Sequence, residues 1–378
     1  MTRVLVWQSG RYGAGPLLAA LLARAFGRLG GVESILSLSS AAELLGQPNA
    51  PPCQLPVRTH SGAAGVAWRL MLAPLTARRL AARLRELRPD FAVCAMPAPL
   101  DLPMALALRR IRIPIAVIVH DAEIHPGDVF PLLLTLQNAL LRRADLAIVL
   151  TSHVGAGLQA SGALPSRLPM QLAKLPPLAL EQPAPPEPHG GPRRVLCFGR
   201  LRTYKGIDLL AEALRLLGPL PDIEARVVGQ GREGAALAAL RALPGVTVEN
   251  RWVPEGEVGA ILNWADIVVL PYREASQSGI APTALAAGRR VVATRVGGLA
   301  EQLAGEPLAT LCEPNASSLA AALAGAAKMA PGSVPDACAA WREFAAGILH
   351  TLTHLPELDS AATFTDARLS CAEQPARR

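Results

Sequence analysis

The sequence is poor in aromatic and charged residues, and rich in aliphatic ones. Aromatic residues make up 4% of the 378 residues and charged residues 18%, whereas hydrophobic residues make up 51%. Such an apolar composition excludes a disordered chain and predicts a large buried interior. The shortage of aromatic residues, with no recognised binding motif among the charges, argues against a nucleic-acid-binding protein.

The cysteine spacing and the lack of a long apolar run indicate the cellular compartment that we expect for the protein. No two cysteines have the C-x-x-C spacing, so neither a zinc site nor a disulfide framework is indicated, and a reducing cytosol fits best. The longest uncharged run, residues 146–166, is interrupted by threonine, serine, histidine and glutamine, so no membrane span is indicated, and the first ten residues read as a strand rather than a signal peptide. We therefore expect a cytoplasmic chain that is not exported and does not cross a membrane. The formal net charge of +7 favours anionic partners such as phosphates, nucleotides or acidic lipids.

Short apolar runs alternate with amphipathic segments in both halves of the chain. This is the pattern of parallel sheets that are covered on both faces, and the length exceeds one comfortable core. Each half therefore predicts a doubly wound α/β domain. The expected strands are Val4–Gln8, Phe91–Ala95, Ile115–His120 and Leu146–Leu150 in the first half, and Arg194–Phe198, Ala225–Val228, Thr247–Asn250, Ile267–Pro271 and Arg290–Thr294 in the second. Expected helices of the first half include Pro16–Leu29 and Thr76–Leu87.

A proline-rich stretch at about residues 175–194 divides the two halves and cannot hold regular structure. It predicts two domains with a cleft between them. The predicted divisions are an N-terminal domain over 1–178, a linker over 179–193, a C-terminal domain over 194–335, a further helix over 336–355 and a disordered tail over 359–378.

Ligand-type residues follow two successive strands of the second half. In open parallel sheets, ligands bind beyond the carboxyl ends of the strands. Arg200 and Lys205 follow the first of these strands and precede a helix, so they are either an anion clamp or a solvated basic pair. Gly229 and Gly231 follow the next strand, in a turn that lets the backbone approach a ligand closely.

A third strand end carries a carboxylate and small polar residues. Glu274 follows Ile267–Pro271, and the run 276–279 (SQSG) leads to Pro282 near a helix start, where proline is tolerated. Two cations and backbone N–H groups can together hold a diphosphate without a metal ion. Because no D-x-D triplet occurs in the chain, we expect neither a metal nor another cofactor.

These segments carry a resemblance to a known family. FGRLRTYKGIDLL (198–210), VVGQGRE (227–233) and the stretch 269–301 resemble the nucleotide-binding half of the retaining group 1 glycosyltransferases, which are GT4-like enzymes with the GT-B fold. Three motifs in the family order make this match specific. The first half resembles the family more weakly, through QSGRYGAGP (8–16) and VIVHDAEIHPGD (117–128). In such families this half binds the acceptor and diverges most.

The resemblance implies an enzyme that moves a sugar from a nucleotide-sugar donor to an acceptor hydroxyl, with retention. A glycan or lipid-linked acceptor is implied, in surface polysaccharide or glycolipid assembly. The helix over 336–355 is expected to cross back to the first domain, and the domains to close on the donor.

The resemblance also implies roles for individual residues. It places Arg200 and Lys205 on the donor diphosphate and Glu274 on the donor sugar, with His120 facing the sugar across the cleft. The other implied donor contacts are Gly13 or Gly15 on the first turn, Gly229, Gly231, Ser276, Gln277, Ser278, Gly279 and Thr283.

One departure from the family pattern affects the nucleoside. The second glutamate of the family motif falls where this chain has Pro282, or Thr283 if one residue is inserted. In relatives this glutamate contacts the ribose hydroxyls, so either Thr283 replaces it with a single hydrogen bond or the ribose is held differently. The loss keeps open a sugar-nucleotide-binding protein without catalysis, and a GT-B sugar-nucleotide epimerase is a third possibility. A nicotinamide enzyme is a poor interpretation, because the first-turn glycines spell G-x-x-G-x-G rather than G-x-G-x-x-G.

A polar cluster follows the strand that His120 ends. A lone histidine of this kind is more often a core residue, but Asp121, His125 and Asp128 follow it closely. None of these residues has the H-x-x-x-H spacing of two metal ligands on one helix face, so we predict no metal site. We expect His120 to line the cleft, and His125 either to do the same or to lie in a turn.

Residues 67–89 combine leucines with six arginines in the pattern of a basic amphipathic helix. This helix is either an ordinary domain helix with an arginine-rich solvent face or a contact with anionic lipid. The second interpretation would make the protein peripheral on the inner membrane face.

Overall fold

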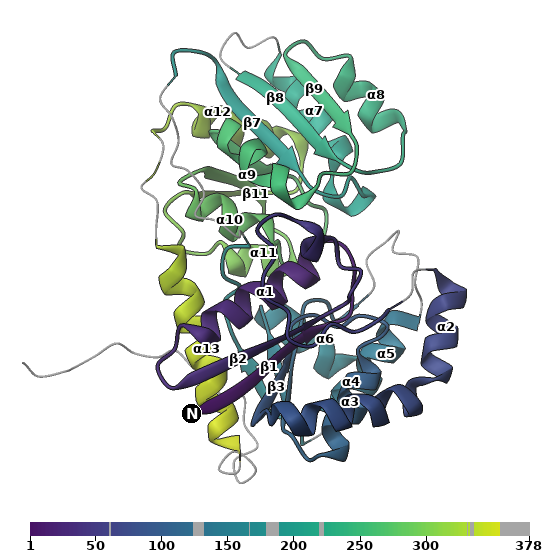
Figure 1. The fold of residues 1–378 in the computed structure, drawn as a ribbon. Coiled ribbons are helices and arrows are strands. Elements are labelled where there is room, and N and C mark those ends of the chain that lie inside the picture. The colour runs from purple at the N-terminus through teal and green to yellow at the C-terminus, as the bar shows by residue number, and fades with distance from the viewer. Residues whose placement is uncertain are drawn as a thin grey trace, which may run out of the picture.

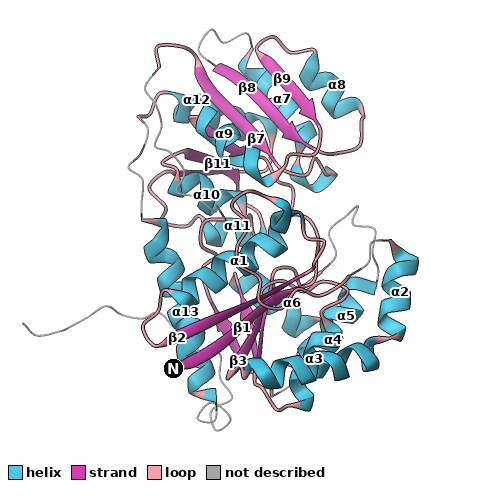
Figure 2. Ribbon diagram, in the orientation of Figure 1, coloured by secondary structure: helices cyan, strands magenta, loops and turns pink. Residues whose placement is uncertain are grey.

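The computed structural model describes residues 1–59, 62–123, 132–165, 167–178, 189–218, 223–330, 332 and 336–355. These residues form two α/β domains, one above the other in Figure 1. Each domain is built on a six-stranded sheet whose paired strands are parallel throughout. Helices cover both faces of each sheet (Figure 2), so the predicted pair of doubly wound α/β domains is confirmed.

The first sheet has the strand order β2-β1-β3-β4-β5-β6. Its strands are β1 (Thr2–Gln8), β2 (Val32–Leu38), β3 (Phe91–Cys94), β4 (Ile115–Val119), β5 (Leu146–Val149) and β6 (Met170–Leu172). The helices of this domain are α1 (Ala14–Gly27), α2 (Ala63–Met71), α3 (Ala73–Leu87), α4 (Leu102–Arg110), α5 (Leu132–Leu141) and α6 (Ser152–Ala160), with a short 3-10 turn η1 (Glu43–Gly46).

The second sheet has the order β12-β11-β10-β7-β8-β9. Its strands are β7 (Arg193–Phe198), β8 (Ile223–Gly229), β9 (Val246–Asn250), β10 (Ile267–Leu270), β11 (Arg290–Thr294) and β12 (Ala309–Cys312). Its helices are η2 (Thr203–Lys205), α7 (Ile207–Leu217), α8 (Ala235–Arg241), α9 (Glu255–Trp264), α10 (Ile280–Ala286), α11 (Gly297–Gln302) and α12 (Ala316–Ala327), and α13 (Ala337–Thr353) follows.

The three strands that the sequence did not predict, β2, β6 and β12, all lie at sheet edges. An edge strand has one neighbour, so it needs less apolar surface than a central strand. β2 carries Glu33, Ser34 and Ser37, and β6 and β12 are only three and four residues long. The apolar pattern that indicates a buried strand is therefore weak in these three segments.

Each sheet buries an apolar cluster on both faces. Successive residues of a strand point to opposite faces. In β1, Val4 and Val6 join the cluster that contains α1, while Leu5 and Trp7 join the cluster that contains α3 and α4. This alternation explains the continuous apolar runs in the sequence.

The last helix, α13, packs on the first domain although it follows the second in the chain (Figure 1). Trp341, Phe344, Ile348 and Leu352 belong to the same buried cluster as α1. The indole N–H of Trp341 also donates to the carbonyl of Pro177, at 2.8 Å. The C-terminal helix is thus part of the first domain's core.

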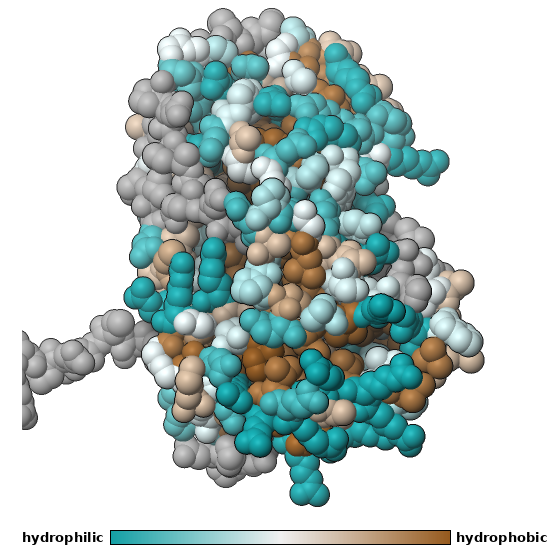
Figure 3. All heavy atoms as spheres, viewed as in Figure 1, coloured by the Kyte–Doolittle hydropathy of each residue, from teal (hydrophilic) through white to brown (hydrophobic). Residues whose placement is uncertain are grey.

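The arginine-rich segment forms two helices rather than the single helix that we expected. The break falls at Leu72, and Pro74 lies in the first turn of α3, where a proline ends one helix and starts another. α3 buries Leu80 and Leu84 in the core, and its outer side is largely hydrophilic in Figure 3. α2 instead leaves Trp68 58% and Met71 73% exposed.

The two domains contact each other through α6 and α11. The Glu301 carboxylate of α11 accepts hydrogen bonds from the backbone N–H of Ser152 at 2.8 Å and from its hydroxyl at 2.6 Å. The N–H of His153 lies 3.4 Å from the same carboxylate. Thr151, which caps α6, donates its hydroxyl hydrogen to the carbonyl of Ser276 at 3.0 Å. The first turn of α6 is therefore completed by groups of the other domain.

No helix in the described part of the chain is long and apolar enough to cross a bilayer. Most of the predicted linker, the whole predicted tail and His125 lie outside the described residues.

Candidate functional site

A pocket of about 340 Å³ lies between the two domains, beyond the carboxyl ends of β1, β7, β8 and β10. Parallel sheets place their ligand sites at these ends. The first domain contributes Arg11, Gly13, Ala14, Pro16, Leu17, Glu43, Leu44, Gln47 and Leu178. The second contributes Phe198, Gly199, Arg200, Tyr204, Lys205, Gly229, Gln230, Trp252, Val253, Glu255, Val258, Tyr272, Ser278, Gly279, Ile280 and Thr283.

The two predicted cations, Arg200 and Lys205, both line this pocket. Gly206 follows the turn that carries them and packs closely against the end of β10. A Cβ at this position would lie 1.8 Å from the carbonyl oxygen of Pro271. With a φ of +64°, Gly206 also has a conformation that side chains disfavour. This close approach fixes the position of Lys205, the residue before Gly206, in the pocket lining.

Lys205 is a cation in a poorly solvated position. Burial, as the largest effect, lowers the pKa of its ammonium from 10.5 to about 8, and the charge of Arg200 lowers it further. Tyr204, Cys197 and Asp121 act in the opposite direction. Its Nζ lies 3.7 Å from the centre of the Tyr272 ring, and no carboxylate among the described residues forms an ion pair with it.

The predicted glycines divide into two groups. Gly13 and Gly229 line the pocket, and a Cβ at Gly13 would meet no atom within 4 Å. A Cβ at Gly229 would instead lie 1.8 Å from the carbonyl oxygen of Gly199, so this glycine also brings β7 and β8 together. Gly15 packs against the side chain of Gln8, and Gly231 packs against Leu201. Both of these lie outside the pocket lining.

The loop after β10 is held by hydrogen bonds to the end of α11. The side-chain amide of Gln302 accepts from the N–H of Ser278 at 2.8 Å and donates to its carbonyl at 2.9 Å. Ser278 and Gly279 line the pocket, whereas Ser276 and Glu274 do not. Glu274 is exposed at the surface in this arrangement.

His120 lies at the end of β4 and is bonded to the other domain. The side-chain N–H of Gln277 donates to Nδ1 of His120 at 3.1 Å, and Nε2 of His120 lies 3.4 Å from the carbonyl of Ala95. Burial lowers the pKa of the imidazole, although the Asp121 charge opposes this. The structure thus brings His120 and Gln277 together from the two domains, although neither lines the pocket.

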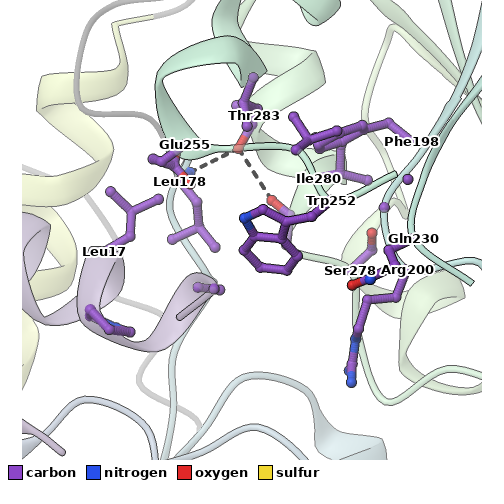
Figure 4. A pocket seen from close by; sticks show the side chains of 18 of the residues that line it. Leu17, Leu178, Phe198, Arg200, Gln230, Trp252, Glu255, Ser278, Ile280 and Thr283 are labelled. Carbon is purple, nitrogen blue, oxygen red and sulfur yellow. Dashed lines mark hydrogen bonds between the residues drawn. The ribbon is translucent and has the colours of Figure 1, made fainter. Parts of the chain in front are cut away.

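Thr283, the candidate for the missing glutamate, uses its hydroxyl within the protein. The hydroxyl accepts from the N–H of Leu178 at 2.8 Å and donates its one hydrogen to the carbonyl of Gly279 at 3.2 Å, as Figure 4 shows. A hydroxyl has a single hydrogen to donate. Of the two alternatives for the ribose, this geometry favours the second, in which another group holds it.

Sequence reasoning missed several charged and aromatic pocket residues, among them Glu43, Trp252 and Glu255. Trp252 and Glu255 follow β9, whose carboxyl end lies at the same edge of the sheet as the ends of β7 and β8. The sequence predicts this strand as Thr247–Asn250, so the residues just after it are candidates for the ligand site in the same way as Arg200 and Lys205. Ligands bind beyond the carboxyl ends of parallel strands, and this rule was the signal that could have found Trp252 and Glu255.

Comparisons with known proteins agree with this architecture. A family model described as "Glycosyl transferases group 1" matches residues 192–328, and one described as "Glycosyl transferase 4-like domain" matches residues 13–170. The chain belongs to the group 1 glycosyltransferases. The predicted family is confirmed at this level.

Individual relatives of this glycosyltransferase are distant or match only part of it. A D-inositol 3-phosphate glycosyltransferase of Jonesia denitrificans is 36% identical over 122 residues, which are 29% of this chain and 28% of that protein. The crystal structure of HepE from Anabaena in complex with UDP has a TM-score of 0.64 at 19% identity, over 96% of this chain and 100% of that chain. A putative UDP-N-acetylglucosamine 2-epimerase from Listeria monocytogenes has a TM-score of 0.63 at 14% identity, over 94% and 96%. The two structures show a shared fold.

Proposed function

We propose that this glycosyltransferase moves a sugar from a nucleoside-diphosphate sugar to an acceptor hydroxyl, with retention and without a metal ion. The observation that carries the proposal is the partly buried ammonium of Lys205, which lies beside Arg200 and has no described carboxylate paired to it. A diphosphate would supply the missing negative charge. The related HepE structures contain UDP, UDP with glucose, or UDP-glucose, which supports a uridine nucleotide as the first donor to test.

The two cations suit the departure of a diphosphate. When the bond between the anomeric carbon and the phosphate oxygen breaks, its electron pair passes to the diphosphate. Arg200 and Lys205 would stabilise the negative charge that develops there. The acceptor oxygen forms the new bond on the same face, and its proton passes to the departing phosphate oxygen.

Two further residues are proposed to contact the donor sugar. His120 would face the sugar from the first domain, and Glu274 from the loop after β10. In the present arrangement Gln277 occupies Nδ1 of His120 and Glu274 is exposed, so both contacts require the loop and the domains to move on donor binding. Such a movement is the expected closure of the cleft.

We further propose a glycan or lipid-linked acceptor, as in surface polysaccharide or glycolipid assembly. The exposed Trp68 and Met71 of α2, next to the arginines of α3, support a contact with an anionic membrane surface. The enzyme would then act in the cytoplasm, peripheral on the inner membrane face.

Turnover with defined donors tests the function. The protein is incubated with UDP-glucose, UDP-N-acetylglucosamine or GDP-mannose, with and without lipid and glycan fractions of the producing cell, and nucleotide release is measured. We expect release that depends on one acceptor fraction, and NMR of the product should show the donor's anomeric configuration. A changed sugar nucleotide formed without acceptor would indicate an epimerase instead, and donor binding without any turnover would indicate a binding protein.

The cation pair supplies the matched binding test. Arg200→Ala and Lys205→Ala should each weaken the binding of nucleoside diphosphate, because a charge-assisted bond of roughly 1.5–3 kcal/mol is removed. Lys328→Ala, at an exposed lysine after α12, is the control and should bind normally. Normal binding by both pocket variants would show that the diphosphate lies elsewhere.

A further inference from the structure

Glu255 is a carboxyl group in the pocket without a described partner. It stands at the start of α9, lines the pocket, and forms no hydrogen bond or ion pair with any described residue. Glu43, which lines the same pocket from the other domain, repels it. Burial, with this repulsion added, raises the pKa of Glu255 from 4.5 to about 7.

Such a carboxyl group destabilises the folded protein unless a hydrogen-bond donor contacts it. Burial without a partner is unfavourable for the ionised form, and the like charge of Glu43 adds to this. A carboxylate accepts hydrogen bonds at both oxygens and donates none. A ligand with two adjacent hydroxyl groups would satisfy it in one contact.

The position of Glu255 within the pocket separates it from the cations. In Figure 4, Glu255 lies on the side of the pocket where Leu178 and Thr283 lie, while Arg200 lies on the other side with Gln230 and Ser278. Trp252, a residue that is 42% exposed, appears between them in this view. The pocket thus has a cationic side that suits a diphosphate. Its other side has a hydrogen-bond acceptor, Glu255, and a flat ring, Trp252, which together suit a nucleoside.

We propose that the carboxylate of Glu255 accepts hydrogen bonds from the 2′- and 3′-hydroxyls of the donor's ribose. The ribose is one methylene group from the diphosphate, and it carries the only adjacent pair of hydroxyls in the nucleoside. Thr283 has already donated its hydrogen to Gly279, so it cannot donate to a ribose oxygen. This inference rests on the proposed function, because it takes the pocket to be a nucleotide-sugar site.

The test compares ribose and deoxyribose nucleotides on matched variants. The dissociation constants of UDP, 2′-deoxy-UDP and 3′-deoxy-UDP are measured by calorimetry on the full chain and on Glu255→Ala. GDP and ADP with their deoxy counterparts are included, so that the base does not decide the result. Glu257→Ala is the control, because Glu257 lies on the same helix and forms an ion pair with Arg251 at 2.8 Å outside the pocket lining.

We expect the unaltered protein to bind the ribonucleotide about tenfold more tightly or better than either deoxynucleotide, as for a hydrogen bond to a charged acceptor. Glu255→Ala should lose this preference, Glu255→Gln should keep part of it, and Glu257→Ala should keep all of it. Removing the repulsion with Glu43 should not unfold the variant, and a thermal melt verifies this.

Two outcomes overturn the proposal. The first is an equal ribose preference in the unaltered protein and in Glu255→Ala. The second is a variant that keeps this preference but changes its selection among UDP, GDP and ADP, which would place Glu255 on the base. If no nucleoside diphosphate binds the unaltered protein, the proposed function itself fails, and this is a separate result.

Discussion

Replacing Lys205 by methionine should stabilise the unliganded protein while weakening nucleotide binding. The pKa of Lys205 is lowered from 10.5 to about 8, and at 1.36 kcal/mol for each pH unit this corresponds to about 3 kcal/mol against the charged form. Because the side chain keeps some solvent contact, this value is an upper bound. Methionine also loses the contact between the ammonium and the Tyr272 ring, which costs about 0.5–2 kcal/mol. The net gain should be about 1–2 kcal/mol at pH 7.

The sign of this effect depends on pH. Between pH 8 and pH 10.5 the unfolded chain binds the proton of Lys205 more tightly than the folded chain, so the stability of the unaltered protein rises with pH in this window. Below pH 8 both states are protonated and the cost of the charge is complete. The advantage of Lys205→Met should therefore be largest at pH 7 and disappear towards pH 10.

Thermal melting without nucleotide, at pH 7 and pH 10, measures the effect as a rise of a few degrees in Tm for Lys205→Met at pH 7. Lys328→Met is the control and should melt like the unaltered protein. Calorimetry with UDP should show weaker binding by Lys205→Met alone. A variant that is less stable at pH 7, or equally affected at both pH values, would refute the view that Lys205 carries an uncompensated charge.

Three other changes have defined outcomes. Glu274→Gln should lower turnover and leave UDP affinity nearly intact, because its proposed partner is the donor sugar; a large loss of UDP affinity would contradict this role. Turnover should survive excess EDTA, and a complete loss that magnesium or manganese restores would show a metal requirement. Trp341→Ala should lower the free energy of unfolding by about 3–5 kcal/mol, but Trp341→Phe by only about 1, because phenylalanine loses chiefly the bond to Pro177. Equal losses in urea denaturation would show that packing against α1 contributes little.

The sequence predicts the central strands and the cationic part of the site for the same physical reason. Strands that are buried on both faces must be continuously apolar, so β1, β4, β7 and β10 are visible, and the residues just after them can be searched. Arg200 and Lys205 follow such a strand and line the pocket, as this reasoning predicts. The edge strands β2, β6 and β12 lack that signal and are not predicted, whereas the edge strand β9 is.

Other parts of the site depend on contacts between distant residues. The glycines are an example of what the sequence alone does not distinguish. Gly13 and Gly229 line the pocket, whereas Gly15 and Gly231 make room for the side chain of Gln8 and for Leu201. A glycine that faces a ligand and one that faces a side chain are identical in sequence. The repulsion between Glu43 and Glu255 likewise exists only because two domains meet.

The completion of α6 by Glu301 and Ser276 has a consequence for engineering by domain exchange. A chimera that joins this N-terminal half to the C-terminal half of a relative would keep the start of α6 but lose the carboxylate that receives the N–H groups of Ser152 and His153. It would also separate α13 from the cluster that it completes around α1, unless the crossover restored residues 336–355. A transplantable unit of this protein is thus discontinuous in sequence: it consists of residues 1–178, the last helix, and a glutamate at position 301 of whatever half is joined to it.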